Sequence, residues 1–149
     1  MPEQHTKNDG VESGGVTREA VIEERDDGLA DGEERRSLYA EISREMVRLY
    51  KEQFGRGPTK AKTCFADADT IVCTLEDSFT PAERNMVHLG EHQRLRDVRM
   101  FFQYASEPNF LESIESLTGR KVRAFVSGLD AEQDVSSEVF YLEPRQPAP

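Results

Sequence analysis

Two histidines four residues apart form the sharpest candidate for metal chemistry in this sequence. The run His88-Leu89-Gly90-Glu91-His92 matches the pattern H-x-x-E-H, in which two histidines on one helix face could bind a zinc ion that activates water for hydrolysis. Gly90 weakens the helix that the motif needs, and the sequence shows no obvious third ligand. We favour two solvent-facing histidines and keep a zinc hydrolase acting through His88 and His92 as the weaker alternative.

Two cysteines, Cys64 and Cys73, lie in neighbouring segments that read as paired strands. Two cysteines are too few for a disulfide scaffold, and the pair lacks the C-x-x-C spacing of a redox motif. We interpret both as small buried apolar residues. The alternative is a redox pair formed across the hairpin.

Basic residues gather after two Gly-Arg dipeptides, at 55–56 and 119–120. Neither stretch is a phosphate-binding loop of the form G-x-x-x-x-G-K-[ST]. The structural interpretation is a helix end that leads into a strand. The functional interpretation is a loop that binds an anion or an acidic partner, with six candidate residues: Arg56, Lys60, Lys62, Arg120, Lys121 and Arg123. We predict no catalytic residue and no cofactor.

The apolar spacing of the first half predicts the elements that must position these residues. An apolar stripe from Leu38 to Phe54 predicts an amphipathic helix that begins near Ser37, a potential N-cap, and stops at Gly55. β-Type runs at 60–66 and 70–75 predict a hairpin. The run Thr80-Pro81-Ala82-Glu83 then predicts a helix start with a capping box.

The second half continues with helices and a second hairpin. Gly90 is predicted to divide two helices, and the apolar stripe of the second comprises Leu95, Val98, Phe101, Phe102 and Ala105. Arg94, Arg96 and Arg99 form a third basic group, which is either a further part of the binding surface or a solvated helix face. The apolar face resumes after Pro108 up to Gly119, and strands are expected at 122–127 and 135–142.

These elements predict an α+β fold in the order α-β-β-α-α-β-β. We expect a two-layer sandwich, in which a four-stranded, mainly antiparallel sheet carries about three to four helices on one face. Each half runs from a helix through Gly-Arg into a hairpin that ends in Leu-Glu, at 75–76 and 142–143. The few shared identities leave an internal duplication open.

Charge and composition suggest the domain limits. Residues 1–36 hold eleven acidic and five basic residues and no sustained apolar stripe, which predicts a disordered acidic tail. Residues 37–144 are expected to form one domain and residues 145–149 a flexible C-terminus. The formal net charge of −10 disfavours nucleic acid as a partner unless a local basic patch exists. Without a run of about 18 apolar residues or an apolar signal core, we expect a cytoplasmic protein with no transmembrane segment.

Four blocks together resemble a known family. They are F-G-R-G-P-T-K-A-K at 54–62, T-P-A-E at 80–83, L-T-G-R-K-V at 117–122 and E-V-F-Y-L-E-P at 138–144. Over roughly residues 37–144 the chain resembles the MpsC-like family, formerly a domain of unknown function. That family is named after the C component of a sodium-translocating, membrane-potential-generating system. The resemblance implies an accessory role beside membrane proteins that move cations or inorganic carbon, and it supplies no catalytic residues.

Three functional hypotheses follow. The first is a non-enzymatic accessory or regulatory protein whose basic Gly-Arg loops bind an anionic ligand or a protein partner, such as a membrane ion-transport subunit. The second is a nucleic-acid-binding regulator that uses the same loops. The zinc hydrolase is the weakest. An amphipathic domain of this size can also form a homodimer.

Overall fold

The chain, as a computed structural model, is described at residues 20–23 and 32–146. The elements in order are β1 (Val21–Glu23), α1 (Gly32–Phe54), β2 (Lys60–Asp67), β3 (Thr70–Glu76), α2 (Pro81–His88), α3 (His92–Ala105), α4 (Glu107–Thr118), β4 (Val122–Asp130) and β5 (Val135–Leu142).

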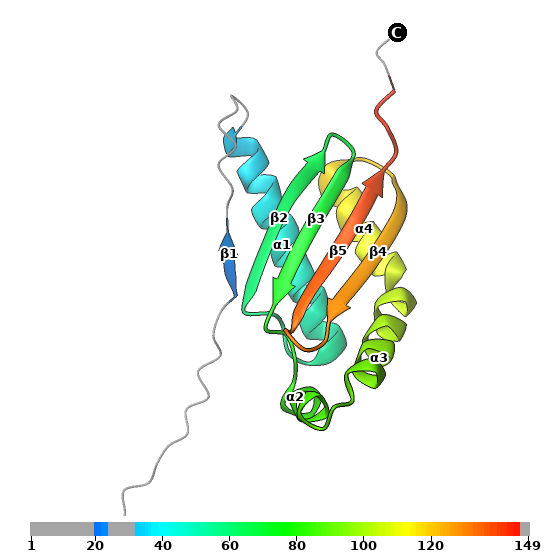
Figure 1. Ribbon diagram of the computed structural model, residues 1–149. Coiled ribbons are helices and arrows are strands. Elements are labelled where there is room, and N and C mark those ends of the chain that lie inside the picture. Colours follow the sequence, from blue (N-terminus) through cyan, green and yellow to red (C-terminus); the bar gives the residue numbers. More distant parts are fainter. Residues whose placement is uncertain (1–19, 24–31, 147–149) are drawn as a thin grey trace, which may run out of the picture.

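One five-stranded sheet with the strand order β1-β2-β3-β5-β4 carries the helices (Figure 1). Strands β2, β3, β5 and β4 pair antiparallel with their neighbours, and β1 pairs parallel with β2. Helices α1 and α4 lie side by side behind the sheet, and α3 lies towards β4. The α+β class and the two layers that the sequence predicts are therefore confirmed.

The sheet differs from the predicted four-stranded one by its first strand. Val21 pairs with Lys60 at the edge of β2, and its backbone N–H donates to the carbonyl of Thr59 at 2.7 Å. A three-residue strand is too short to show periodicity, while a sheet edge offers unpaired backbone groups to any extended segment. Part of the segment predicted as a disordered tail is thus a strand, and the sheet is mixed, with one parallel pair beside three antiparallel pairs.

The first helix also begins earlier than predicted. Gly32–Arg36 belong to α1, so Ser37 lies inside the helix rather than at its N-cap. Glu33 and Glu34 in the first turn interact favourably with the helix dipole, and the Glu-Arg run has a high helix propensity. The rest of the predicted tail, residues 1–19 and 24–31, lies outside the described residues, as do residues 147–149 of the predicted flexible C-terminus.

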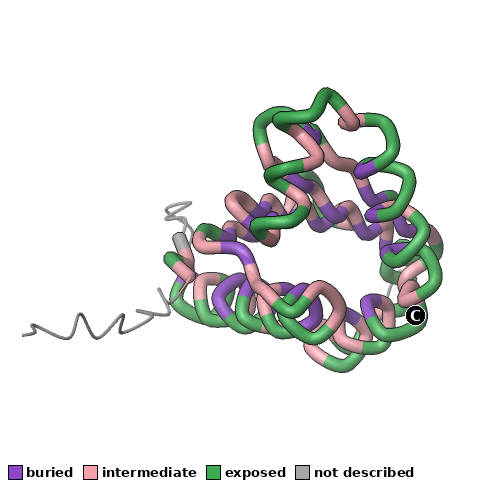
Figure 2. Tube along the Cα trace, turned by 90° about the horizontal axis from the view of Figure 1, so that it is seen from below, coloured by how far each residue is buried: buried purple, intermediate pink, exposed green. Residues whose placement is uncertain are grey.

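The core lies between the sheet and the helices, where buried residues line the inner sides of both layers (Figure 2). Ile42, Met46 and Leu49 supply the face of α1, as predicted, and Phe110 and Ile114 supply that of α4. The sheet contributes alternate residues that include Ile71 and Phe140. Burying these side chains is the main stabilising contribution to the fold.

The predicted capping box and the glycines predicted to end helices are confirmed. Thr80 and Glu83 form the predicted capping box at the start of α2. Gly90, with φ of 78°, separates α2 from α3. The glycine of each Gly-Arg dipeptide, Gly55 with φ of 79° and Gly119 with φ of 68°, adopts the left-handed conformation that ends a helix.

The apolar stripe predicted for α3 is right for Leu95, which is buried, but wrong for Val98, Phe101, Phe102 and Ala105, which face away from the core. The buried residues of α3 are Leu95, Arg99 and Gln103. Phe101 is 69 % exposed and Val98 is 46 % exposed. The inward face is set by polar partners on other elements, which a periodicity within one helix cannot reveal. Arg99 is accordingly not on a solvated face.

Candidate functional site

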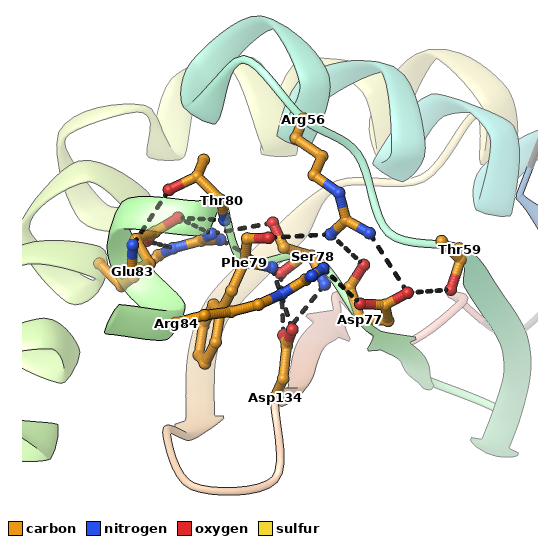
Figure 3. Close-up of polar contacts among 10 residues, drawn as sticks. Arg56, Thr59, Asp77, Ser78, Phe79, Thr80, Glu83, Arg84 and Asp134 are labelled. Carbon is orange, nitrogen blue, oxygen red and sulfur yellow. Dashed lines mark hydrogen bonds and ion pairs between the residues drawn. The ribbon is translucent and has the colours of Figure 1, made fainter. Parts of the chain in front are cut away.

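Arg56, the arginine of the first Gly-Arg turn, holds the segment between β3 and α2 (Figure 3). Its guanidinium donates to the carbonyls of Asp77 at 2.6 Å and Phe79 at 3.0 Å. It also lies 3.2 Å from the carboxylate of Asp77, which accepts a hydrogen bond from Thr59. Most of this cation's hydrogen-bonding capacity is therefore satisfied by its own chain.

The same segment is held from two other sides. The Asp134 carboxylate accepts from the backbone N–H groups of Ser78 and Phe79, both at 3.0 Å. Arg99 donates to the Ser78 carbonyl at 3.1 Å and to both carboxylate oxygens of Glu83, at 2.5 and 2.7 Å. Half burial opposes ionisation of Glu83, but the Arg99 hydrogen bonds hold its pKa below the usual value. This polar cluster joins α1, α2, α3 and the β4–β5 turn.

Arg120, the arginine of the second Gly-Arg turn, occupies a corresponding position at the other hairpin. Its guanidinium donates to the carbonyls of Ala68 at 2.8 Å and Glu143 at 2.9 Å, and to the Asp69 carboxylate at 2.5 Å. In both halves, the arginine after the left-handed glycine thus binds the backbone just beyond the hairpin that follows. This parallel is a structural counterpart of the Gly-Arg echo in the sequence.

The two basic clusters lie at opposite ends of the sheet. Lys60 begins β2, close to Arg56, whereas Arg120 contacts the turn at the far end of β2. Eight strand residues at about 3.3 Å each separate these ends by roughly 25 Å. The six candidates are therefore not brought together into one site.

The lysines and Arg123 also have contacts within the chain. Lys60 lies 3.4 Å from Glu76, and Lys121, whose side chain is 81 % exposed, lies 3.9 Å from Glu115. Arg123 lies over the ring of Tyr141 at 5.4 Å. Lys62 pairs in register with Thr74 on β3.

A groove of about 740 Å³ adjoins Arg120. Its walls include Leu38, Tyr39 and Phe65, with Arg145 among the lining residues. The arginine of the second Gly-Arg turn therefore lines a hollow large enough for a small ligand.

The histidine motif does not lie on one helix. His88 ends α2, His92 begins α3, and Gly90 turns the chain between them. The i, i+4 geometry that would bring both imidazoles to one zinc ion is therefore lost. Within residues 20–23 and 32–146, no group of three His, Cys, Asp or Glu side chains is placed to hold a metal ion.

The two cysteines are free and lie on opposite faces of the sheet. Cys73 pairs with Thr63 and is buried, whereas Cys64 pairs with Val72 and is partly exposed. Successive residues of a strand point to opposite faces of the sheet. Cys64 follows Thr63, the partner of Cys73, so its side chain points away from the face that holds Cys73. Burial raises the pKa of the Cys73 thiol to about 12, which disfavours a reactive thiolate.

The sequence patterns did not single out Glu138, whose carboxylate is buried. It is fully buried on β5 and accepts hydrogen bonds from Tyr50 at 2.6 Å and Ser127 at 2.9 Å, and from Gln103. Burial raises its pKa to about 7. The available signal was its place in the alternation of 135–142, where 136, 138, 140 and 142 face inward.

Helix α3 exposes several large apolar side chains on one face. Val98, Phe101 and Phe102 are 46 %, 69 % and 42 % exposed, and they are spaced as one helical stripe. Phe102 packs edge-on against Phe54 of α1, which holds its ring in place. Contiguous exposed apolar side chains on an ordered helix are typical of protein-binding surfaces. None of the helices within 32–146 has both the length and the apolar character needed to cross a bilayer.

Comparison with known proteins places the chain in a family. No curated protein and no solved structure matches it. Residues 34–144, which include both Gly-Arg turns, α3 and all four antiparallel strands, match the family described as Na+-translocating membrane potential-generating system (MpsC). The chain therefore belongs to the MpsC family.

Proposed function

We propose that this protein is a non-enzymatic accessory or regulatory component of a sodium-translocating, membrane-potential-generating system, and that it acts by binding a protein subunit of that system. The observation that carries the proposal is the exposed apolar stripe of α3, formed by Val98, Phe101 and Phe102. The family assignment supplies the kind of partner, a membrane ion-transport subunit.

The chemistry of α3 favours a protein partner with an apolar contact surface. Exposed apolar residues at i, i+3 and i+4 are the anchors of a helix that docks into a groove. Arg94 and Asp97 lie one turn before Val98 and Phe101, so opposite charges border the stripe and can set the orientation of the partner. Phe101 is the expected energetic centre because large aromatic side chains dominate such contacts.

The Gly-Arg loops are the second candidate surface. Most N–H donors of Arg56 and Arg120 bind their own chain, which favours a structural role for both turns. The groove beside Arg120 is the specific observation that favours a small anionic ligand there. Nucleic-acid binding would use the same basic residues, and no further observation on the described residues favours it.

The test is capture from detergent-solubilised membranes of the source cells. The tagged full chain is compared with the Val98→Ser/Phe101→Ser double variant. A Val126→Ser variant serves as the matched control, because Val126 on β4 is 48 % exposed, as Val98 is 46 % exposed. We expect the wild type and the control to capture a membrane-spanning subunit, and the double variant to retain at most about a tenth of it.

A further variant, Lys121→Ala/Arg123→Ala, tests the Gly-Arg alternative in the same experiment. Loss of capture with this variant, together with full capture by the α3 variant, would move the docking surface to the second Gly-Arg loop. Sedimentation of the purified chain tests self-association: a dimer that the α3 variant dissociates would show that a second copy, rather than a membrane subunit, covers α3.

A further inference from the structure

Glu138 lies where a carboxylate is costly. It is at the middle of β5, paired with Cys73 on β3 and Ser127 on β4, and it has no exposed surface. Ionised carboxylates are seldom fully buried without a paired cation or a metal. The side chains that contact it by hydrogen bonds, Tyr50, Gln103 and Ser127, are all neutral groups.

The hydrogen bonds are distributed unevenly over the carboxyl group. All three donors, from Tyr50, Gln103 and Ser127, reach Oε1. Oε2 is buried and has no hydrogen-bond partner among the described residues. The same holds for Oε1 of Gln103, although the amide nitrogen of that residue already donates to Glu138. Two buried acceptors therefore lack a donor, and they belong to Glu138 and Gln103, which are hydrogen-bonded to each other.

From these contacts we infer that Glu138 is a buried proton-binding site, protonated on Oε2, and that it forms a carboxylic acid–amide pair with Gln103. An O–H bond forms at Oε2 with a proton from solvent, and that hydroxyl donates to Oε1 of Gln103. The amide N–H of Gln103 donates to Oε1 of Glu138 in return. One proton then satisfies both acceptors, and unsatisfied buried polar groups are what folded proteins avoid.

The groups around the pair agree with a neutral carboxyl. On α1, burial raises the pKa of Tyr50, so it stays a neutral donor. On β3, burial also keeps the Cys73 thiol neutral. On α3, the charge of Arg99 is matched by the carboxylate of Glu83. Desolvation raises the pKa of Glu138 itself to about 7.

The proton also holds α3 against the sheet. Gln103 and Arg99 are the inward-facing polar residues of α3, and Gln103 is the one that contacts β5. Loss of the proton leaves a charge inside the interface between α3 and β5. If α3 is the docking surface, this pair regulates it, and that consequence alone rests on the proposed function.

The test is the pH dependence of unfolding by urea for the wild type and for Glu138→Gln, which mimics the protonated acid. Glu132→Gln is the matched control, since Glu132 lies in the exposed β4–β5 turn. Because the pKa of Glu138 is raised in the folded state, its contribution to stability is complete below the pKa of the unfolded chain and falls as pH rises towards the folded value. Between pH of about 5 and 7, the wild-type folding constant should fall up to about tenfold per pH unit relative to Glu138→Gln.

The control should keep the wild-type slope, and parallel curves for the wild type and Glu138→Gln would overturn the inference. A second measurement needs no variant to fold: ¹³C NMR of glutamate-labelled wild-type protein should show one carboxyl that stays protonated to nearly neutral pH. If all glutamates titrate in the ordinary acidic range, Glu138 is ionised and the inference fails. Neither measurement involves a partner, so a failure here is distinct from a failure of the proposed docking.

Discussion

Arg99 lies inside the interface between α3 and its neighbours, with only 2 % of its surface exposed. Its guanidinium lies 3.7 Å from the centroid of the Phe54 ring and pairs with Glu83 through two hydrogen bonds. A bidentate pair of this kind offsets the cost of removing both charges from water. At the residue scale, α3 is therefore positioned by an ion pair and by the Glu138–Gln103 contact as much as by apolar packing.

Removing the Arg99 side chain should destabilise the protein strongly. Arg99→Ala leaves the half-buried Glu83 without its cation and the Ser78 carbonyl without a donor, at a cost of about 3–5 kcal/mol. Urea unfolding monitored by circular dichroism measures this change. Arg96→Ala, an exposed site on the same helix, should change the free energy of unfolding by less than about 0.5 kcal/mol. Equal effects for the two variants would contradict the structural role of Arg99.

The Glu83–Arg99 ion pair also predicts part of the loss of folding stability at acidic pH. The pKa of Glu83 is lowered in the folded state, so its contribution to stability is present above the unfolded pKa and is lost as pH falls through the folded one. Arg99→Ala should consequently show a shallower loss of stability in acid than the wild type.

At the scale of elements, α3 has two competing faces. Val98, Phe101, Phe102 and Ala105 form the more apolar stripe, yet Leu95, Arg99 and Gln103 face inward. The choice depends on where Glu83 and Glu138 lie, and both belong to other elements. Helix α1 has a single apolar face, so its orientation followed from periodicity alone.

The two Gly-Arg turns depend on a backbone conformation that only glycine adopts readily. Gly55→Ala and Gly119→Ala should each destabilise the protein by about 1 kcal/mol, because both residues have positive φ. An added Cβ meets nothing within 4 Å at either position beyond the adjacent residues, so the loss comes from the local backbone conformation and not from contacts with the rest of the protein. Thermal or urea unfolding measures it.

Gly128 provides the control for these substitutions. It also has open space around a Cβ, but it is not among the glycines with positive φ. Gly128→Ala should therefore be neutral or slightly stabilising, by up to about 1 kcal/mol. A cost at Gly128 equal to that at Gly55 would show that the left-handed conformation is not the cause.

At the scale of the whole molecule, the hairpins of the two halves of the chain join into one sheet. Strands β3 and β5 pair at the centre of the sheet, so the two hairpins form one surface with the Gly-Arg turns at its opposite ends. Strand β1 adds three residues to one edge, and all buried hydrophobic residues of the described core lie between Tyr39 and Leu142.

A chain that starts at Gly32 should therefore fold. It loses only the edge strand β1 of the described elements, and we expect cooperative unfolding with a melting temperature within a few degrees of that of the full chain. Circular dichroism and a thermal melt provide the comparison. Non-cooperative melting of the shortened chain would show that β1 is part of the folding unit.

The sequence by itself determined the class of fold, the order of the α1, β2, β3, α2, β4 and β5 segments, the capping box and the glycine-ended helices. These features arise from residues close together in the chain, so local propensity and periodicity reveal them. Only the tertiary structure decided that α3 turns its aromatic residues outward, that Arg56 and Arg120 bind their own backbone, and that Glu138 meets Gln103. Each of these depends on a partner distant in sequence, which no periodicity encodes.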